Sequence, residues 1–155
     1  MSIEEHLAEF SFVAGESNPE KLRPKVLVVD DERVITDTLA MILSVLGYQS
    51  FVAYNGSEGL QKAREVKPDM IISGVKNGEG PNGVDMAIQI HDEMSETKFL
   101  LVSGMSSSAD IFEKRLAEGH SFLTSVPLLA KPVEPKVLLR WCKSGGNPDS
   151  LCERT

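Results

Sequence analysis

The sequence contains little cysteine and little histidine, and this scarcity excludes several kinds of site. Of its 155 residues, two are cysteine (Cys142 and Cys152) and three are histidine (His6, His91 and His120). Neither set has the spacing of a zinc site, so we expect the histidines to be ordinary surface residues. The sequence allows a disulfide between the two cysteines, but two free thiols in a reducing compartment are the expected state.

Long apolar runs and an excess of positive charge are lacking as well. No stretch approaches the ~20 apolar residues of a membrane span, and no basic segment followed by an apolar run predicts a signal peptide. The formal net charge is -7 at pH 7, which argues against nucleic-acid binding because an acidic surface repels the phosphate backbone. We therefore expect a cytoplasmic protein with neither a membrane nor a nucleic acid as its partner.

Short apolar runs alternate with helical patterns along most of the chain. The runs are brief and rich in branched residues, which is typical of strands buried on both faces. Strands are predicted at residues 26–29, 49–53, 70–73, 99–102 and 126–130, and helices at residues 34–46, 55–66, 84–94, 106–118 and 134–143. This alternation predicts an α/β fold, a doubly wound parallel sheet with helices on both faces.

Two segments lie outside the alternation. Residues 1–24 are predicted to be an N-terminal extension, in which Ile3, Leu7 and Phe10 would share one face of a short helix. A docked helix and a frayed arm both remain open for this segment. Residues 144–155 are predicted to be a polar tail, and they are too few for an output domain.

Polar residues follow several predicted strands at their carboxyl ends, where open α/β sheets bind ligands. Asp30 and Asp31 follow the first strand, Ser103 the fourth and Lys131 the fifth. Carboxylates suit Mg²⁺, and a hydroxyl with an ammonium suits phosphate oxygens, so this set fits Mg²⁺-assisted phosphoryl transfer. The third strand is followed by Gly74, which offers no nucleophile.

Four of these segments resemble the signatures of response-regulator receiver domains, the CheY-like family. They read VLVVDDE at 26–32, KPDMIIS at 67–73, LLVSG at 100–104 and AKP at 130–132. Their order matches the family, and together they cover about residues 25–142. The resemblance implies a flavodoxin-like (βα)5 receiver domain over residues 25–143, with strand order 2-1-3-4-5. It also implies a bacterial signalling protein of the two-component phosphorelay type rather than an enzyme.

The same resemblance shows what is missing. The family places its phosphoacceptor aspartate directly after the third strand, at the position of Gly74. Asp69 precedes that strand, so five residues displace it by roughly 16 Å. Asp85 falls in the following helix and faces the same objection. We therefore predict a receiver that lacks its acceptor aspartate.

Two further departures accompany this loss. The loop from Gly74 to Gly83 is one residue longer than in the family, and it brings Lys76 toward the expected metal. The family's switch aromatic lies three residues before the lysine, where this chain has Leu128. Phe122 is close in sequence, but an insertion displaces it.

Three functions remain open. The first is a degenerate receiver that works by contact with a histidine kinase or another signalling protein, through the last two helices and the fifth strand. The second is a phosphorylation- or Mg²⁺-responsive receiver with another acceptor. The third is a haloacid-dehalogenase-like phosphatase, although Asp30-Asp31-Glu32 gives Asp-x-Glu where that family has Asp-x-Asp. We expect Mg²⁺ binding at Asp30 and Asp31 to be weak or vestigial, with Lys131 neutralising both. The Lys131–Pro132 peptide bond can be cis.

Overall fold

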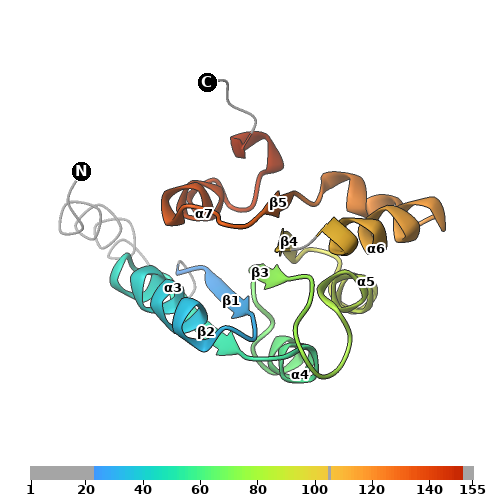
Figure 1. Ribbon diagram of the computed structural model, residues 1–155. Helices are drawn as coiled ribbons and strands as arrows, with labels where there is room; N and C mark the ends of the chain where they lie inside the picture. The colour runs from blue at the N-terminus through green and yellow to red at the C-terminus, as the bar shows by residue number, and fades with distance from the viewer. Residues whose placement is uncertain (1–22, 105, 152–155) are drawn as a thin grey trace.

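A five-stranded parallel sheet forms the centre of the protein. The computed structural model describes residues 23–104 and 106–151 (Figure 1). The strand order is β2-β1-β3-β4-β5, which confirms the predicted doubly wound topology. The strands are β1 (Lys25–Val29), β2 (Gln49–Ala53), β3 (Met70–Gly74), β4 (Lys98–Ser103) and β5 (Leu128–Ala130). The prediction for Ile3, Leu7 and Phe10 lies outside the described residues.

Helices cover both faces of this sheet, as Figure 1 shows. They are α3 (Arg33–Val45), α4 (Gly56–Val66), α5 (Gly83–Glu93), α6 (Ser106–Ala117) and α7 (Pro135–Lys143), with short 3-10 helices η1 (Ser121–Ser125) and η2 (Pro148–Leu151). Helices α4 and α5 begin where asparagines cap them: Asn55 accepts from the Glu58 amide at 2.8 Å, and Asn82 from the Asp85 amide at 2.9 Å.

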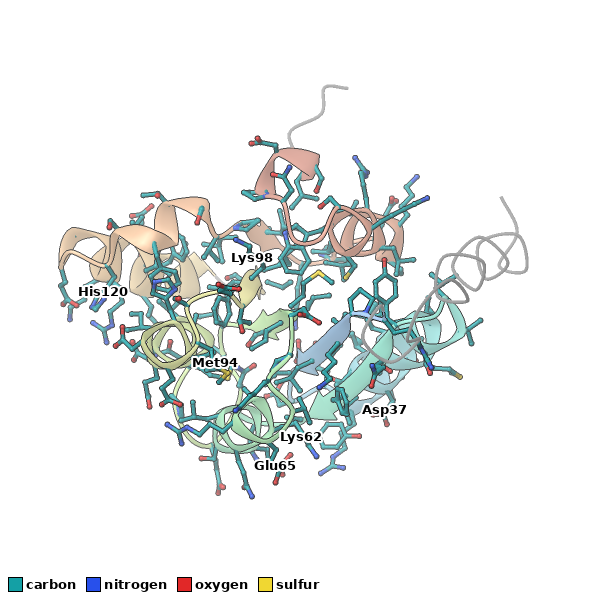
Figure 2. The ribbon with its side chains drawn as sticks, turned by 180° about the vertical axis from the view of Figure 1, so that it is seen from behind. Asp37, Lys62, Glu65, Met94, Lys98 and His120 are labelled. Atoms are coloured by element: carbon teal, nitrogen blue, oxygen red, sulfur yellow. The ribbon has the colours of Figure 1, made fainter. Side chains whose placement is uncertain are left out.

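Alternating strand residues divide into two apolar clusters, one on each face. Leu27, Val29 and Ile71 pack with residues of α4, α5 and α6. Val28 and Ile72 pack with residues of α3 and α7. Both sets are buried, which explains why the strands read as continuous apolar runs rather than alternating ones. Figure 2 shows the outer side of α4, where Lys62 and Glu65 form a surface ion pair at 3.5 Å.

The fifth strand is shorter than predicted. We expected residues 126–130, but the strand begins at Leu128, because residues 121–125 turn into η1. The carbonyl of Pro127 still accepts a hydrogen bond from the Leu101 amide at 2.9 Å. Proline cannot donate to the ladder, so the regular pairing starts only after it.

The chain after α7 folds back on the domain. Residues Pro148–Leu151 form η2, and Leu151 packs against the α3/α7 cluster. Cys142 is buried at the same place as a free thiol. Burial raises the pKa of this thiol to about 12. Cys152 lies outside the described residues, as do the last three residues of the chain.

Candidate functional site

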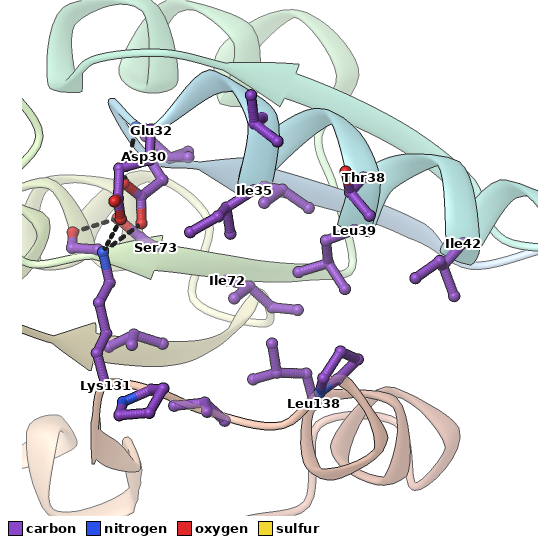
Figure 3. Close-up of a pocket in the computed structure, with 18 residues that line it drawn as sticks. Asp30, Glu32, Ile35, Thr38, Leu39, Ile42, Ile72, Ser73, Lys131 and Leu138 are labelled. Atoms are coloured by element: carbon purple, nitrogen blue, oxygen red, sulfur yellow. Dashed lines mark hydrogen bonds and ion pairs between the residues drawn. The ribbon is translucent and has the colours of Figure 1, made fainter.

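Lys131 connects the fifth strand to the first at the carboxyl end of the sheet. Its Nζ lies 3.2 Å from Asp30 Oδ2 and 2.7 Å from Glu32 Oε1 (Figure 3). Burial lowers the pKa of Lys131, but hydrogen bonds to Glu32 and Asp30 outweigh it and leave the pKa above its usual value. The bond from Lys131 to Pro132 is cis. Lys131 is therefore held as a cation inside an acidic corner.

The carboxylate that completes this corner is not the one that the sequence predicted. We expected Lys131 to neutralise Asp30 and Asp31, but its second partner is Glu32, the residue that precedes α3. Asp31 is exposed and forms no hydrogen bond or ion pair with the described residues. Ser103 is buried at the end of β4, and its carbonyl accepts from the Lys131 amide at 2.8 Å. Three of the four predicted residues therefore meet in one corner.

Gly74 is the last residue of β3 and is buried beside Asp30. A Cβ atom at Gly74 would lie 3.0 Å from Asp30 Oδ2 and 3.0 Å from Asn77 Oδ1. Such contacts are tighter than ordinary van der Waals packing, so a side chain at this position would require Asp30 or Asn77 to shift by a few tenths of an ångström.

Asn77 is a residue of this site that sequence reasoning missed. It is 2% exposed, and its Nδ2 donates to Ser73 Oγ at 3.0 Å, while Ser73 Oγ donates to the Gly74 carbonyl at 2.8 Å. Asn77 Oδ1 is buried with no hydrogen-bond partner among the described residues. A lone asparagine in a glycine-rich loop carries no sequence signal for such a place.

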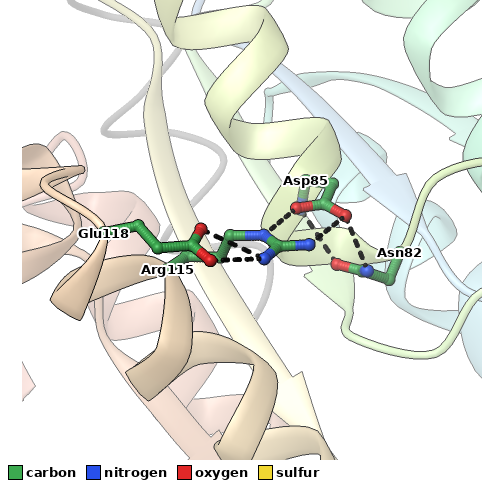
Figure 4. Close-up of polar contacts among 4 residues, drawn as sticks. All are labelled: Asn82, Asp85, Arg115 and Glu118. Atoms are coloured by element: carbon green, nitrogen blue, oxygen red, sulfur yellow. Dashed lines mark hydrogen bonds and ion pairs between the residues drawn. The ribbon is translucent and has the colours of Figure 1, made fainter.

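The two other aspartates near this segment of the sequence, Asp69 and Asp85, lie away from the corner and have partners of their own. Asp69 lies at the opposite edge of the sheet, as predicted, where its Oδ2 accepts from the Lys25 amide at 2.8 Å. Asp85 is held by Arg115 of α6 at 2.6 Å and by Asn82 at 3.0 Å (Figure 4). The hydrogen bond from Arg115 keeps the pKa of Asp85 below its ordinary value.

The long loop after β3 places Asn77 at the corner, and its later part packs on α4. The carbonyl of Glu79 accepts from the Ser57 amide at 3.2 Å. A Cβ atom at Gly56 would come within 1.9 Å of the Pro81 carbonyl oxygen, so only glycine allows this approach. Lys76 is exposed and forms no ion pair within the described part of the chain.

The aromatic residue nearest the predicted switch position has another role. Leu128 is half-buried against the α4/α5/α6 cluster. Phe122 stacks on His91 with ring centroids 3.9 Å apart, and it meets Phe99 edge-on at 6.3 Å. His91 is half-buried, and its ring contributes to the packing between α5 and η1.

The resemblance to receiver domains implies Mg²⁺ at this corner, which requires oxygen donors that are free to bind it. Asp30 has both oxygens engaged, since Oδ1 accepts from the Glu32 amide at 3.1 Å and Oδ2 pairs with Lys131. Within the described ranges, no group of three His, Cys, Asp or Glu residues could hold a metal. Asn77 Oδ1 adds a neutral oxygen but no charge. Mg²⁺ prefers carboxylates and dehydrates reluctantly, so these residues fit it poorly.

The corner opens into an apolar groove of about 590 Å³ between α3 and α7. One wall is α3, and the other is the segment from Lys131 to Leu138, as Figure 3 shows. Residues of β1, β3 and β4, among them Val28, Ile72 and Val102, form the floor. The described residues contain no helix that is both long and apolar enough to span a membrane.

A parallel sheet of this order, with acids after β1 and a lysine after β5, agrees with what the resemblance to receiver domains implies. Residues 26–141 match the response regulator receiver domain family, and the chain belongs to it. It is 30% identical over 112 residues to the chemotaxis protein CheY of Thermotoga maritima, with 72% of this chain and 88% of the relative covered.

Other relatives and solved structures agree. The DNA-binding response regulator MtrA of Mycolicibacterium smegmatis is 25% identical over 76% of this chain, which spans only 48% of that protein. The structure of CheY4 from Vibrio cholerae is 27% identical, with a TM-score of 0.62 over 79% of this chain and 98% of that one. A receiver from Methanospirillum hungatei, at 24% identity and a TM-score of 0.67, covers 83% and 96% and shares the fold.

Proposed function

We propose that this chain is a two-component receiver that does not use aspartyl phosphorylation at the family's position and signals by protein contact. The observation that carries the proposal is Gly74, whose Cβ position lies 3.0 Å from both Asp30 Oδ2 and Asn77 Oδ1. A phosphoryl group needs a nucleophile at this point and a cation beside it. Gly74 supplies no side-chain nucleophile at the acceptor position, and Asp30 is paired with Lys131.

The direct test is phosphorylation of the full chain by acetyl phosphate with Mg²⁺, followed by intact mass. We expect no gain of a phosphoryl group, while a receiver with an acceptor aspartate gains one under the same conditions. A stoichiometric gain would overturn the proposal, and peptide mapping would then identify the acceptor. That result would favour the receiver with a non-standard acceptor.

Two variants test whether the crowding at Gly74 matters. Gly74→Asp restores the acceptor but places it against Asn77, so we expect little phosphorylation. Gly74→Asp with Asn77→Ala removes the competing amide, and we expect clearly more phosphoryl gain than in the single variant. Equal gains in both would show that Asn77 does not obstruct the position. Circular dichroism of both variants checks that the domain is folded.

The proposed partner is a histidine kinase or another signalling protein, with α6, β5 and α7 as the contact surface. Strand β5 is at the edge of the sheet, and its residues are only partly covered. Helix α7 presents Lys136, whose side chain is 77% exposed. Lys136→Glu should preserve the fold and weaken binding to the phosphotransfer domain of a kinase, and titration calorimetry measures the affinity. Unchanged affinity would place the contact elsewhere.

A further inference from the structure

The exposed large apolar side chains of the described residues all lie on one helix. They are Val34 (79% exposed), Ile35 (51%), Met41 (61%) and Val45 (39%), all in α3. Val34, Met41 and Val45 are seven and four residues apart, so they share one side of the helix. A contiguous apolar patch on a soluble domain marks a surface that another segment covers.

This stripe continues into the groove between α3 and α7. Ile35 and Ile42 line the groove from the α3 side, opposite Val133, Pro135 and Leu138 (Figure 3). Stripe and groove therefore form one apolar surface along the length of α3. With 13 residues, α3 is ~20 Å long.

Residues 1–22 join the described domain at one end of this surface. Arg23 Nε donates to the Gly47 carbonyl at 3.2 Å, and the Gln49 amide donates to the Pro24 carbonyl at 2.9 Å. Gly47 lies two residues after the end of α3. Arg23, the first described residue, therefore lies close to the end of the helix at which Val45 ends the apolar stripe.

The sequence of these residues suits the surface. Ile3, Leu7 and Phe10 share one helical face, while Glu4, Glu5 and Glu9 make the segment acidic. The last turn of α7, beyond the part of this helix that lines the groove, is basic, with Arg140 and Lys143. Residues 11–22 can span up to ~40 Å when extended, twice the length of α3, so the apolar triplet reaches any point of the stripe.

We propose that residues 2–13 dock as an amphipathic helix of this same chain on the α3 stripe and the adjoining groove. Ile3, Leu7 and Phe10 face the stripe, and the glutamates lie toward α7 and solvent. This inference is independent of phosphorylation at Gly74. Because the groove ends at Lys131, the docked segment lies next to the acidic corner.

The first test changes the helix and leaves the segment intact. Met41→Asp places a charge on the stripe, and we expect a Glu-specific protease to cleave after Glu5 and Glu9 at least about tenfold faster than in the natural chain, a docking loss of ~1.4 kcal/mol. Ser44→Asp adds the same charge to α3 outside the stripe and should leave cleavage unchanged. Equal cleavage of all three proteins would overturn the proposal.

The second test changes the segment and observes the helix. Leu7→Asp should raise hydrogen exchange of the α3 backbone in the full chain, whereas Ala8→Asp, on the other face of the segment, should not. Sedimentation of the natural chain identifies the occupant. A monomer with a protected α3 supports docking within one chain. A dimer that Met41→Asp dissociates would show that a second copy covers the stripe, which would overturn the proposal.

Discussion

The two faces of the sheet are closed by different means. On the α4/α5 face, Arg64 pairs with Glu93 at 2.7 Å, and on the α5/α6 side Arg115 pairs with Asp85 at 2.6 Å. On the α3/α7 face, the ion pairs that the described residues form between the two walls all involve one residue, Lys131, at the end of the groove. On one face, ion pairs join neighbouring helices to each other. On the other face, ion pairs join the two walls only at the end of the groove, at Lys131.

Residue size accounts for part of this difference. On the closed face, a Cβ atom at Gly59 would lie 2.8 Å from Met86 Sδ and 3.1 Å from Val29, so α4 lies close to the sheet because position 59 is glycine. On the open face, α3 directs Ile35 and Ile42 into the space between the helices. The comparison teaches that one sheet can carry closely packed helices on one face and an open apolar groove on the other.

The largest expected effect comes from truncating a side chain on the closed face. Ile90→Ala removes a side chain that is 0% exposed, and we expect it to lower the free energy of unfolding by about 2–5 kcal/mol. Ile35→Ala makes the same truncation in the groove wall, at a residue 51% exposed, and should cost no more than about 0.5 kcal/mol. Urea unfolding measures both.

A loss at Ile35 as large as that at Ile90 would show that the groove is closed in solution. If residues 2–13 dock on the groove, Ile35→Ala should also remove a contact with them, which adds a small part to its loss of free energy of unfolding. In that case, Ile35→Ala combined with Leu7→Asp should cost less than the sum of the two single losses, because both substitutions remove the same contact.

The second effect concerns Lys131 at the end of the open face. Lys131→Met leaves Asp30, whose side chain is 10% exposed, without its cation. We expect a loss of about 1–2 kcal/mol at neutral pH, after allowing for solvent screening of a lysine that is 30% exposed. Lys136→Met, at an exposed lysine of α7, is the matched control and should change stability by less than about 0.5 kcal/mol.

The pH dependence of this loss has a definite sign. The pKa of Lys131 is raised in the folded protein, so its contribution is complete at neutral pH and is lost as pH rises beyond the ordinary lysine range. In urea unfolding at rising pH, the free energy of unfolding of the natural chain should therefore approach that of Lys131→Met. A constant difference across that range would show that packing of the lysine stem, not its charge, stabilises the corner.

The sequence predicts the fold better than it predicts the site. The parallel sheet with helices on both faces follows from apolar periodicity and crossover length, whereas the strand order came from the resemblance to receiver domains. The only strand placed poorly is β5, where Pro127 and η1 interrupt a run that looked continuous. Periodicity assigns helices to faces of the sheet, but it contains no distance between neighbouring helices. The groove between α3 and α7 was therefore absent from the prediction.

Side-chain direction explains what the site prediction missed. The acidic triplet after β1 was visible, but spacing alone could not say that Glu32 turns toward Lys131 while Asp31 turns away. Asn77 was invisible for a different reason, because its position depends on the fold of the loop and on a hydrogen bond to Ser73. Local sequence specifies neither of these.

The smallest expected effect tests the bridge on the closed face, and its signature is again pH dependence. Arg115→Met removes the guanidinium that holds Asp85. The pKa of Asp85 lies below its ordinary value of 3.8, chiefly because of the hydrogen bond from Arg115. A carboxyl with a lowered pKa stabilises the fold above its ordinary pKa and loses that contribution as pH falls. The difference in free energy of unfolding between the natural chain and Arg115→Met should therefore be largest at about pH 7 and smallest at about pH 3.

Arg64→Met is the control for this bridge, because it breaks the more exposed pair with Glu93, whose side chains are 49% and 40% exposed. Solvent screening should make its loss the smaller of the two at neutral pH. Urea unfolding at both pH values compares the two variants directly. If Arg115→Met lost as much stability at about pH 3 as at about pH 7, the arginine would act by packing between α5 and α6, and charge would not be what closes this face.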